Sequence, residues 1–161
     1  MTQPAGVRLG LGFDSHPADE GRPLFLGGVR FEGEPGLAGH SDGDVVCHAL
    51  ADALLGAGAL GDIGTLFPDD DPATAGIPGR ELLAGAVEAV RAAGLAPEAC
   101  DVVVLAERPH VADRRDEVRA ALAAVLGIPR DRVSVKGKRP EGLGLGSDGA
   151  GCLALAVLRP A

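Results

Sequence analysis

Three residues in the N-terminal part of the chain have the types and spacing of a metal-binding site. Asp14 and His16 stand two residues apart in a predicted strand, so their side chains project from the same face. His48 lies on a predicted helix, one turn after Asp44 and one turn before Asp52. A carboxylate and two imidazoles are good ligands for Zn²⁺ or a similar divalent metal, and three protein ligands leave one tetrahedral position for substrate. The spacing alone leaves open a simpler alternative, in which Asp14 caps a turn and His48 pairs with an Asp of its own helix.

Two polar loops add further candidate groups. The segment 61–79 holds four Asp residues, and such a loop can bind hydroxyl groups or hard cations, although most acidic loops are simply solvated. The Gly-rich segment 137–151 could hold a phosphate through its backbone N–H groups, or it could be a plain connection. Glu141 is a single carboxylate within that segment. Neither loop predicts a site by itself.

Length and composition limit the classes of protein that need to be considered. The 161 residues predict a single domain, 1–161. A net charge of −8, without a basic stripe and without Trp or Tyr, argues against a nucleic-acid partner. No apolar run reaches the roughly 18 residues of a membrane span, and no signal peptide is visible. Three widely spaced cysteines favour buried thiols in a reducing compartment. We therefore expect a cytoplasmic protein with no membrane partner.

The elements that must position the candidate residues mix strands and helices. We expect one helix with its N-cap at Asp42 and its end at Gly56, and a loop over 61–79. Further strands are expected over 7–13, 101–106, 133–136 and 153–158, a strand or hairpin over 24–31, and helices over 80–93 and 113–126. This pattern predicts an α/β (α+β) two-layer sandwich, a small mixed β-sheet with helices on one face. The chain has four Phe and no Trp or Tyr, so its core is built from smaller side chains that bury less area. We therefore expect extra burial from oligomerisation or extra stability from a metal.

Three segments together resemble the family of 2-C-methyl-D-erythritol 2,4-cyclodiphosphate synthases, which acts in the non-mevalonate route to isoprenoids. They are GFDSH at 12–16, LAGHSDGDVVCHALADALLGAGALGDIGTLFPDDDP at 37–72, and RELL at 80–83. The resemblance covers essentially the whole chain, densely up to residue 72 and more weakly afterwards. It implies a homotrimer of small α/β subunits with active sites between neighbours. It also implies a metal-dependent phosphoryl transfer that closes 4-diphosphocytidyl-2-C-methyl-D-erythritol 2-phosphate to the 2,4-cyclodiphosphate and releases CMP.

The resemblance further implies roles for individual residues. The zinc ligands fall on Asp14, His16 and His48, and the carboxylate for a second ion, Mg²⁺ or Mn²⁺, falls on Glu141. The residues implied to contact the attacking phosphate are His40 and Ser41. Those implied to contact the methylerythritol are Asp62, Ile63, Gly64, Phe67, Asp69 and Asp71. Those implied to contact the cytosine are Ala106, Pro109 and His110. His40, if protonated, would donate a hydrogen bond where negative charge builds up in the transition state.

The C-terminal half departs from the family pattern where phosphates are expected. Lys138, Arg139 and Pro140 stand in place of threonines, one of which stabilises the transferring phosphate in the family. One hypothesis is that neutralisation of the phosphates has moved within the loop, with Arg139 catalytic and Lys138 binding substrate. The alternative is drift with weakened activity, since a long Arg side chain can also block a pocket.

Three other replacements change the chemistry of the same region. Leu145 and Asp148 stand where the family has Phe and Arg, and His110 stands where it has Lys. Such changes could preserve the reaction class while altering the nucleotide or the sugar. Three functions therefore stay open: the synthase itself, a related metal-dependent cyclase or phosphate-transfer enzyme for another nucleotide-linked or phosphorylated substrate, as in secondary metabolism, and a non-catalytic trimeric binding protein.

Overall fold

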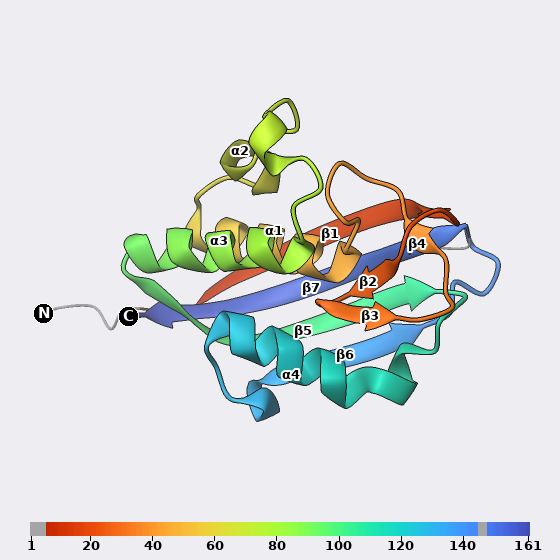
Figure 1. Ribbon diagram of the computed structural model, residues 1–161. Helices are drawn as coiled ribbons and strands as arrows, with labels where there is room; N and C mark the ends of the chain where they lie inside the picture. The colour runs from red at the N-terminus through yellow and green to blue at the C-terminus, as the bar shows by residue number, and fades with distance from the viewer. Residues whose placement is uncertain (1–5, 145–147) are drawn as a thin grey trace, which may run out of the picture.

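A five-stranded β-sheet forms the centre of the computed structural model, which describes residues 6–144 and 148–161 (Figure 1). The strand order is β4 (Gly36–Leu37), β1 (Arg8–Asp19), β7 (Gly149–Pro160), β5 (Leu95–Ala106) and β6 (Val133–Lys138). β5 and β6 pair in parallel, and the other neighbours pair antiparallel. The carboxyl ends of β1, β5 and β6 therefore lie at the same edge of the sheet. A separate hairpin of β2 (Leu24–Leu26) and β3 (Val29–Phe31) confirms the hairpin alternative predicted for 24–31.

Three helices of twelve or more residues lie on one face of this sheet (Figure 1). They are α1 (Val45–Gly58), α3 (Gly79–Ala92) and α4 (Arg115–Leu126), and the shorter helical turns are α2 (Ile63–Leu66), η1 (Pro72–Thr74), η2 (Val111–Arg114) and η3 (Arg130–Arg132). α1 packs across β1 and β7, and α4 packs beside β6. The predicted mixed sheet with helices on one face is confirmed. Within the described part of the chain, no helix combines the length and the apolar character needed to span a membrane.

Two glycines of β1 let α1 approach the sheet unusually closely. A Cβ atom at Gly12 would lie 1.8 Å from the backbone oxygen of Ala49, and one at Gly10 would lie 1.9 Å from that of Ala53. Only glycine fits at such an approach. Since side chains alternate along a strand, Asp14 projects from the same face as Gly12, toward α1. The close packing of α1 on β1 thus brings the helix residue His48 beside the end of β1.

The opposite face of the sheet carries exposed apolar side chains. Leu9, Leu11 and Phe13 of β1 are 64%, 71% and 48% exposed, in alternation with the residues that face α1. On the neighbouring strand, Leu155 pairs with Leu11 and Leu153 pairs with Phe13, and both leucines are about 40% exposed. A contiguous apolar surface of this kind is typical of a protein–protein interface.

Several strands are longer than the sequence pattern predicts. β1 continues past Pro17 to Asp19, where it pairs with the beginning of β7 and with β4. β5 begins at Leu95 and not at Asp101, and β7 covers 149–160 and not only 153–158. The glycine and proline residues in these stretches favour loops in a sequence pattern. Cross-strand pairing along β7 nevertheless holds the stretches in the sheet.

The N-terminus of α1 differs from the prediction. The N-cap is Asp44 and not Asp42, because the fully buried Asp44 carboxylate accepts hydrogen bonds from the N–H groups of Val46 and Cys47. Asp42 instead accepts from the N–H of Gly79 at the start of α3. The helix also continues past Gly56 to Gly58, and the predicted loop over 61–79 contains α2 and η1.

Candidate active site

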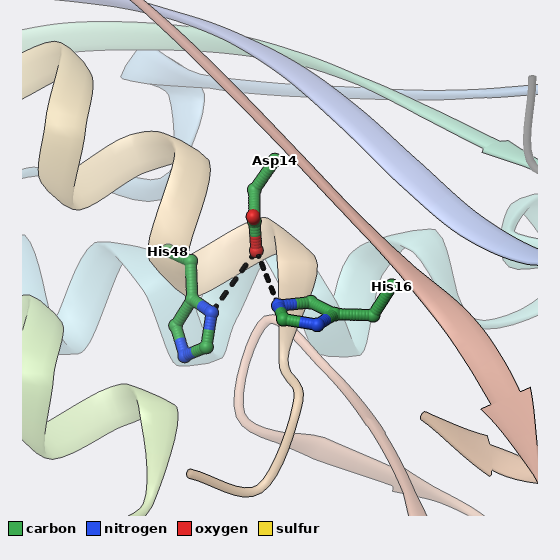
Figure 2. Close-up of side chains that lie close together, drawn as sticks. All are labelled: Asp14, His16 and His48. Atoms are coloured by element: carbon green, nitrogen blue, oxygen red, sulfur yellow. Dashed lines mark hydrogen bonds and ion pairs between the residues drawn. The ribbon is translucent and has the colours of Figure 1, made fainter. Parts of the chain in front are cut away.

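Asp14, His16 and His48 meet beside the carboxyl end of β1 (Figure 2). Asp14 Oδ2 lies 3.0 Å from His48 Nδ1 and 2.9 Å from His16 Nε2. One ligand atom from each residue falls within 4.8 Å of the others. His48 Nδ1 therefore faces Asp14 across the helix–sheet contact and not Asp44 or Asp52 of its own helix. The structure brings together the three residues that the metal hypothesis requires.

One nitrogen in this group has an ion-pair contact but no hydrogen bond. His16 Nε2 is buried and makes no hydrogen bond within the described residues, although Asp14 Oδ2 is 2.9 Å away. A divalent cation bound between His16, Asp14 and His48 would use this nitrogen's lone pair. The one-oxygen, two-nitrogen donor set and the nitrogen without a hydrogen bond both fit a borderline metal such as Zn²⁺.

The ionisation of Asp14 suits a metal ligand. Burial opposes the charged form of this carboxyl, but the imidazoles of His16 and His48 outweigh burial and hold its pKa well below its usual value. For His48, burial lowers the pKa, and Asp14 together with Asp44 and Asp42 raises it above the ordinary value. The carboxylate is thus ready to bind a cation, and a metal competes with a proton at His48.

Ser41 contacts His48 through the ring nitrogen that does not face Asp14. Its hydroxyl is buried and lies 2.8 Å from His48 Nε2, and it accepts a hydrogen bond from the N–H of Gly43. Because His48 Nδ1 faces Asp14, the contact to Ser41 holds the other ring nitrogen and fixes the orientation of the ring.

His40 is exposed and is held by the acidic loop. Its Nε2 lies 3.4 Å from the hydroxyl of Thr74, and its carbonyl accepts a hydrogen bond from the N–H of Gly76. Thr74 is buried, and its hydroxyl also bonds the carbonyl groups of Pro68 and Asp71. The predicted phosphate-contacting histidine is therefore tied to the segment that the resemblance assigns to substrate.

A cavity of about 250 Å³, here called the metal-side cavity, opens beside this group. The predicted site residues that line it are Asp14, His16, His40, Ser41, His48, Ile63, Gly64, Phe67 and Asp69. Four lining residues were not predicted: Asp52, Thr74, Ile77 and Leu82. Asp52 accepts a hydrogen bond of 2.7 Å from the N–H of Ile63 and so ties α2 to α1. Its place one helical turn after His48 was the signal in the sequence that could have identified it.

Two predicted substrate contacts cap helical turns. Asp62 accepts hydrogen bonds from the N–H and the hydroxyl of Thr65 at 2.8 and 2.7 Å. Asp71 accepts one of 2.9 Å from the N–H of Ala73. Neither lines the metal-side cavity. An Asp directly before a short helical segment is a common N-cap, which the sequence could have indicated. Their contact with substrate stays a prediction.

A second cavity of about 180 Å³, here called the basic-side cavity, lies where β5 and β6 end. Its predicted members are Ala106, Pro109, His110, Lys138 and Arg139, and its other lining residues are Val104, Val111, Ala112 and Gly137. The Arg139 guanidinium contacts His110 Nε2. No carboxylate is among the described residues that line it. An apolar floor with cations at its rim suits a nucleotide base that carries phosphates.

The structure does not bring Glu141 to the Asp14 group. Glu141 is exposed, has a left-handed φ of 53°, and lines neither of these two cavities. Asp148 lines a separate cavity of about 190 Å³, and its carbonyl accepts from the N–H of Ala18. Leu145 lies outside the described residues. The role of Glu141 at a second metal stays a prediction.

Comparison with known proteins accords with this geometry. Residues 7–159 match the model of the YgbB family. The 2-C-methyl-D-erythritol 2,4-cyclodiphosphate synthase of Salinibacter ruber is 51% identical over 138 residues, covering 86% of this chain and 88% of that protein. A solved 2C-methyl-D-erythritol-2,4-cyclodiphosphate synthase with CDP bound superposes with a TM-score of 0.87 at 38% identity, covering 94% of this chain and 99% of the other.

A longer relative shows the same fold as one part of its chain. The bifunctional IspDF from Campylobacter jejuni superposes with a TM-score of 0.92 at 37% identity. The match covers 98% of this chain but only 43% of that one. Because the family model matches residues 7–159, nearly all of the described residues, and the Salinibacter ruber relative is 51% identical over 88% of its own length, the chain belongs to the YgbB family.

Proposed function

We propose that this protein is a 2-C-methyl-D-erythritol 2,4-cyclodiphosphate synthase of isoprenoid biosynthesis. Its substrate would be 4-diphosphocytidyl-2-C-methyl-D-erythritol 2-phosphate, and its products the cyclic 2,4-diphosphate and CMP. The observation that carries the proposal is the Asp14–His16–His48 group at the wall of a cavity, in a chain 51% identical to a relative of that name.

The reaction is an intramolecular phosphoryl transfer. An oxygen of the 2-phosphate attacks the β-phosphorus, the bond from that phosphorus to the bridging oxygen of the α-phosphate breaks, and CMP leaves. No water and no oxidant is consumed, so the enzyme would be a phosphorus–oxygen lyase. Two anionic groups must meet, and the barrier is chiefly one of repulsion and orientation.

The residues of the metal-side cavity suit that task. A Zn²⁺ or similar ion held by Asp14, His16 and His48 would withdraw charge from a phosphate. Ser41 holds the His48 ring in place, and His40 stands at the cavity wall where it can donate a hydrogen bond to a phosphate. We assign the second ion, Mg²⁺ or Mn²⁺, to Glu141.

The basic-side cavity would hold the cytidine part. Ala106 and Pro109 line its apolar portion, and Lys138, Arg139 and His110 stand at its rim. We assign phosphate neutralisation to Arg139, as a catalytic residue, and to Lys138. In an acidic protein of net charge −8, these cations and the metal together would make an anionic substrate acceptable.

The protein would act as a homotrimer. The metal-side and basic-side cavities share no lining residue, and β7 separates β1 from β5 in the sheet. One substrate would then bridge the metal-side cavity of one subunit and the basic-side cavity of its neighbour. The exposed apolar face formed by Leu9, Leu11, Phe13 and their partners on β7 supplies the surface that such an assembly would bury. Three buried free cysteines agree with a cytoplasmic location.

A second function is favoured by one observation. The contact of Arg139 with His110 places a large cation in the cavity where the family has smaller or different groups. The same reaction class on another nucleotide-linked or phosphorylated substrate would agree with that change. A non-catalytic trimeric binding protein is the third outcome that an experiment must distinguish.

The test measures CMP and the cyclic diphosphate, by chromatography and ³¹P NMR, with Zn²⁺ and Mg²⁺ present. We expect release of both products, and loss of both products and of bound zinc in His48→Ala. Asp131→Asn, a change at an exposed carboxylate that lines neither cavity, is the matched control and should behave as the wild type. A zinc-loaded protein that releases no CMP would favour the second function, and a wild-type protein that binds no zinc would contradict both enzymatic functions.

A further inference from the structure

Gly85 stands in the middle of α3, where a glycine is unfavourable. The helix covers fourteen residues, and Gly85 is neither at its N-cap nor near its C-terminus. Glycine is a poor helix former because it loses the most backbone freedom on folding. A glycine at such a position usually has a packing reason, and the surroundings of Gly85 supply one.

The aromatic ring of Phe67 occupies the place where a side chain at position 85 would begin. A Cβ atom on Gly85 would lie 2.5 Å from Phe67 Cζ and 3.2 Å from Cε2, closer than such atoms are found. The glycine Gly56 of α1 gives a contrast, because a Cβ atom there would meet nothing within 4 Å. Both are helical glycines, but only Gly85 makes room for another side chain.

Phe67 belongs to the wall of the metal-side cavity. It follows α2 directly, and its N–H donates a hydrogen bond of 2.8 Å to the carbonyl of Ile63. Its ring lines the cavity together with Leu82, which lies one turn before Gly85 on α3, and with Ile63 and Ile77. These residues form an apolar part of the cavity wall, beside the polar Asp14–His16–His48 group.

We propose that Gly85 is a positioning residue that sets the width of the metal-side cavity by letting the Phe67 ring pack against the backbone of α3. Any side chain at position 85 would move the tip of the ring away from α3 by roughly 1 Å, because ordinary contact begins near 3.4 Å. Since the same ring lines the cavity, its displacement changes the space left for the uncharged carbon skeleton of a substrate. The consequence for substrate binding rests on the proposed function, whereas the packing itself does not.

The packing is tested by a double-mutant cycle in thermal stability. The variants are Gly85→Ala, Phe67→Leu and their combination, with Gly56→Ala as the matched control. Gly56→Ala should raise Tm by about 1–3 °C, as expected for removal of a helical glycine. Gly85→Ala should lower Tm by about 3 °C or more in the wild-type background, and should raise it in the Phe67→Leu background, where the ring is gone. An equal effect of Gly85→Ala in both backgrounds, of either sign, would overturn the proposal.

The positioning role is tested by the kinetics of CMP release. Gly85→Ala should raise KM about tenfold and leave kcat within about twofold, since the ring acts on substrate fit and not on the reacting phosphates. Gly56→Ala should leave both constants unchanged. An unchanged KM in Gly85→Ala, with the wild type active, would refute positioning. If the wild type releases no CMP, the proposed function fails. The double-mutant cycle in thermal stability still decides whether the Phe67 ring packs against the backbone at Gly85.

Discussion

The metal-side and basic-side cavities lie at the same edge of one sheet but are built on different principles. In the first, Asp14, His48 and Ser41 form a chain of contacts of 3.0 and 2.8 Å with buried or half-buried members. In the second, Lys138 and Arg139 are exposed. A partly buried polar network loses more when one member is removed than an exposed cation does. If the proposed function holds, we therefore expect larger losses of activity from changes on the metal side than from changes on the basic side.

The largest expected effect comes from Asp14→Asn. The change removes the charge that both histidines face, at nearly constant volume, and leaves a weaker metal ligand. We expect zinc affinity to fall at least about 100-fold and CMP release to fall about 1,000-fold. Zinc titration and a CMP assay measure these effects. A variant that keeps its zinc and its activity would contradict the expectation that the metal-side cavity is more sensitive to substitution than the basic-side cavity.

The next largest effect is expected at Asp44, the N-cap of α1, which is the helix that carries His48. The Asp44 carboxylate accepts hydrogen bonds from the N–H groups of Val46 and Cys47, and also from those of Gly27 and Gly28 in the β2–β3 turn. Asp44→Ala leaves several buried donors without a partner. We expect the free energy of unfolding to fall by about 2–4 kcal/mol.

Urea denaturation measures this loss, with Asp131→Asn as the exposed control. The basic side offers a comparison, because Arg139→Ala should change the unfolding midpoint little. A stability loss in Asp44→Ala no larger than in the exposed control would show that the four hydrogen bonds do not support α1.

The two Asp residues before α1 also show where prediction from sequence stops. Both Asp42 and Asp44 are good N-cap residues, and the sequence pattern favours Asp42. The choice is decided by the N–H groups of Gly27 and Gly28, which come from a hairpin distant in sequence. A local pattern contains no information about such a contact, so the position of the helix could be predicted but its first residue could not.

The candidate site divides in the same way. Residue type and spacing suggested Asp14, His16 and His48 as metal ligands, and the resemblance favoured that interpretation over its simpler alternative. The close helix–sheet packing at Gly10 and Gly12, which joins the three residues, became visible only in the structure. Thr74 could not be predicted, because its contact with His40 exists only when the acidic loop folds back. The packing role of Gly85 could not be predicted either, because it depends on where the Phe67 ring lies in the folded protein.

A smaller effect is expected from Arg139→Ala on the basic side. Removing a cation at the rim of that cavity should lower kcat/KM for CMP release about 10-fold, and the loss should shrink at higher salt because the charge is exposed. Steady-state kinetics at two ionic strengths measure this. Arg139→Thr, which restores the residue type of the family, is the second variant. Higher activity in Arg139→Thr than in the wild type would show that Arg139 blocks the pocket and does not serve it.

The smallest expected effect is a pH dependence that belongs to the metal side alone. In the metal-free protein, the pKa of Asp14 lies below its ordinary value of 3.8, so its contribution to stability is present above that value and is lost as the pH falls further. The pKa of His48 lies above its ordinary value of 6.5, so its contribution is complete below 6.5 and is lost as the pH rises through the folded-state value. His16 also lowers the pKa of Asp14, so the Asp14–His48 pair accounts for part of the acidic side, and its contribution should be greatest between about pH 4 and 6.5.

Urea denaturation in EDTA across this range measures the effect. We expect a decline of at most about 1 kcal/mol as the pH rises above 6.5, because the pair is partly open to solvent. The decline should vanish in His48→Ala and persist in Arg139→Ala. If His48→Ala keeps the full decline, the titrating pair is not the source. Zinc should suppress the decline as well, since a bound metal replaces the proton on His48 and removes its titration from the folded state.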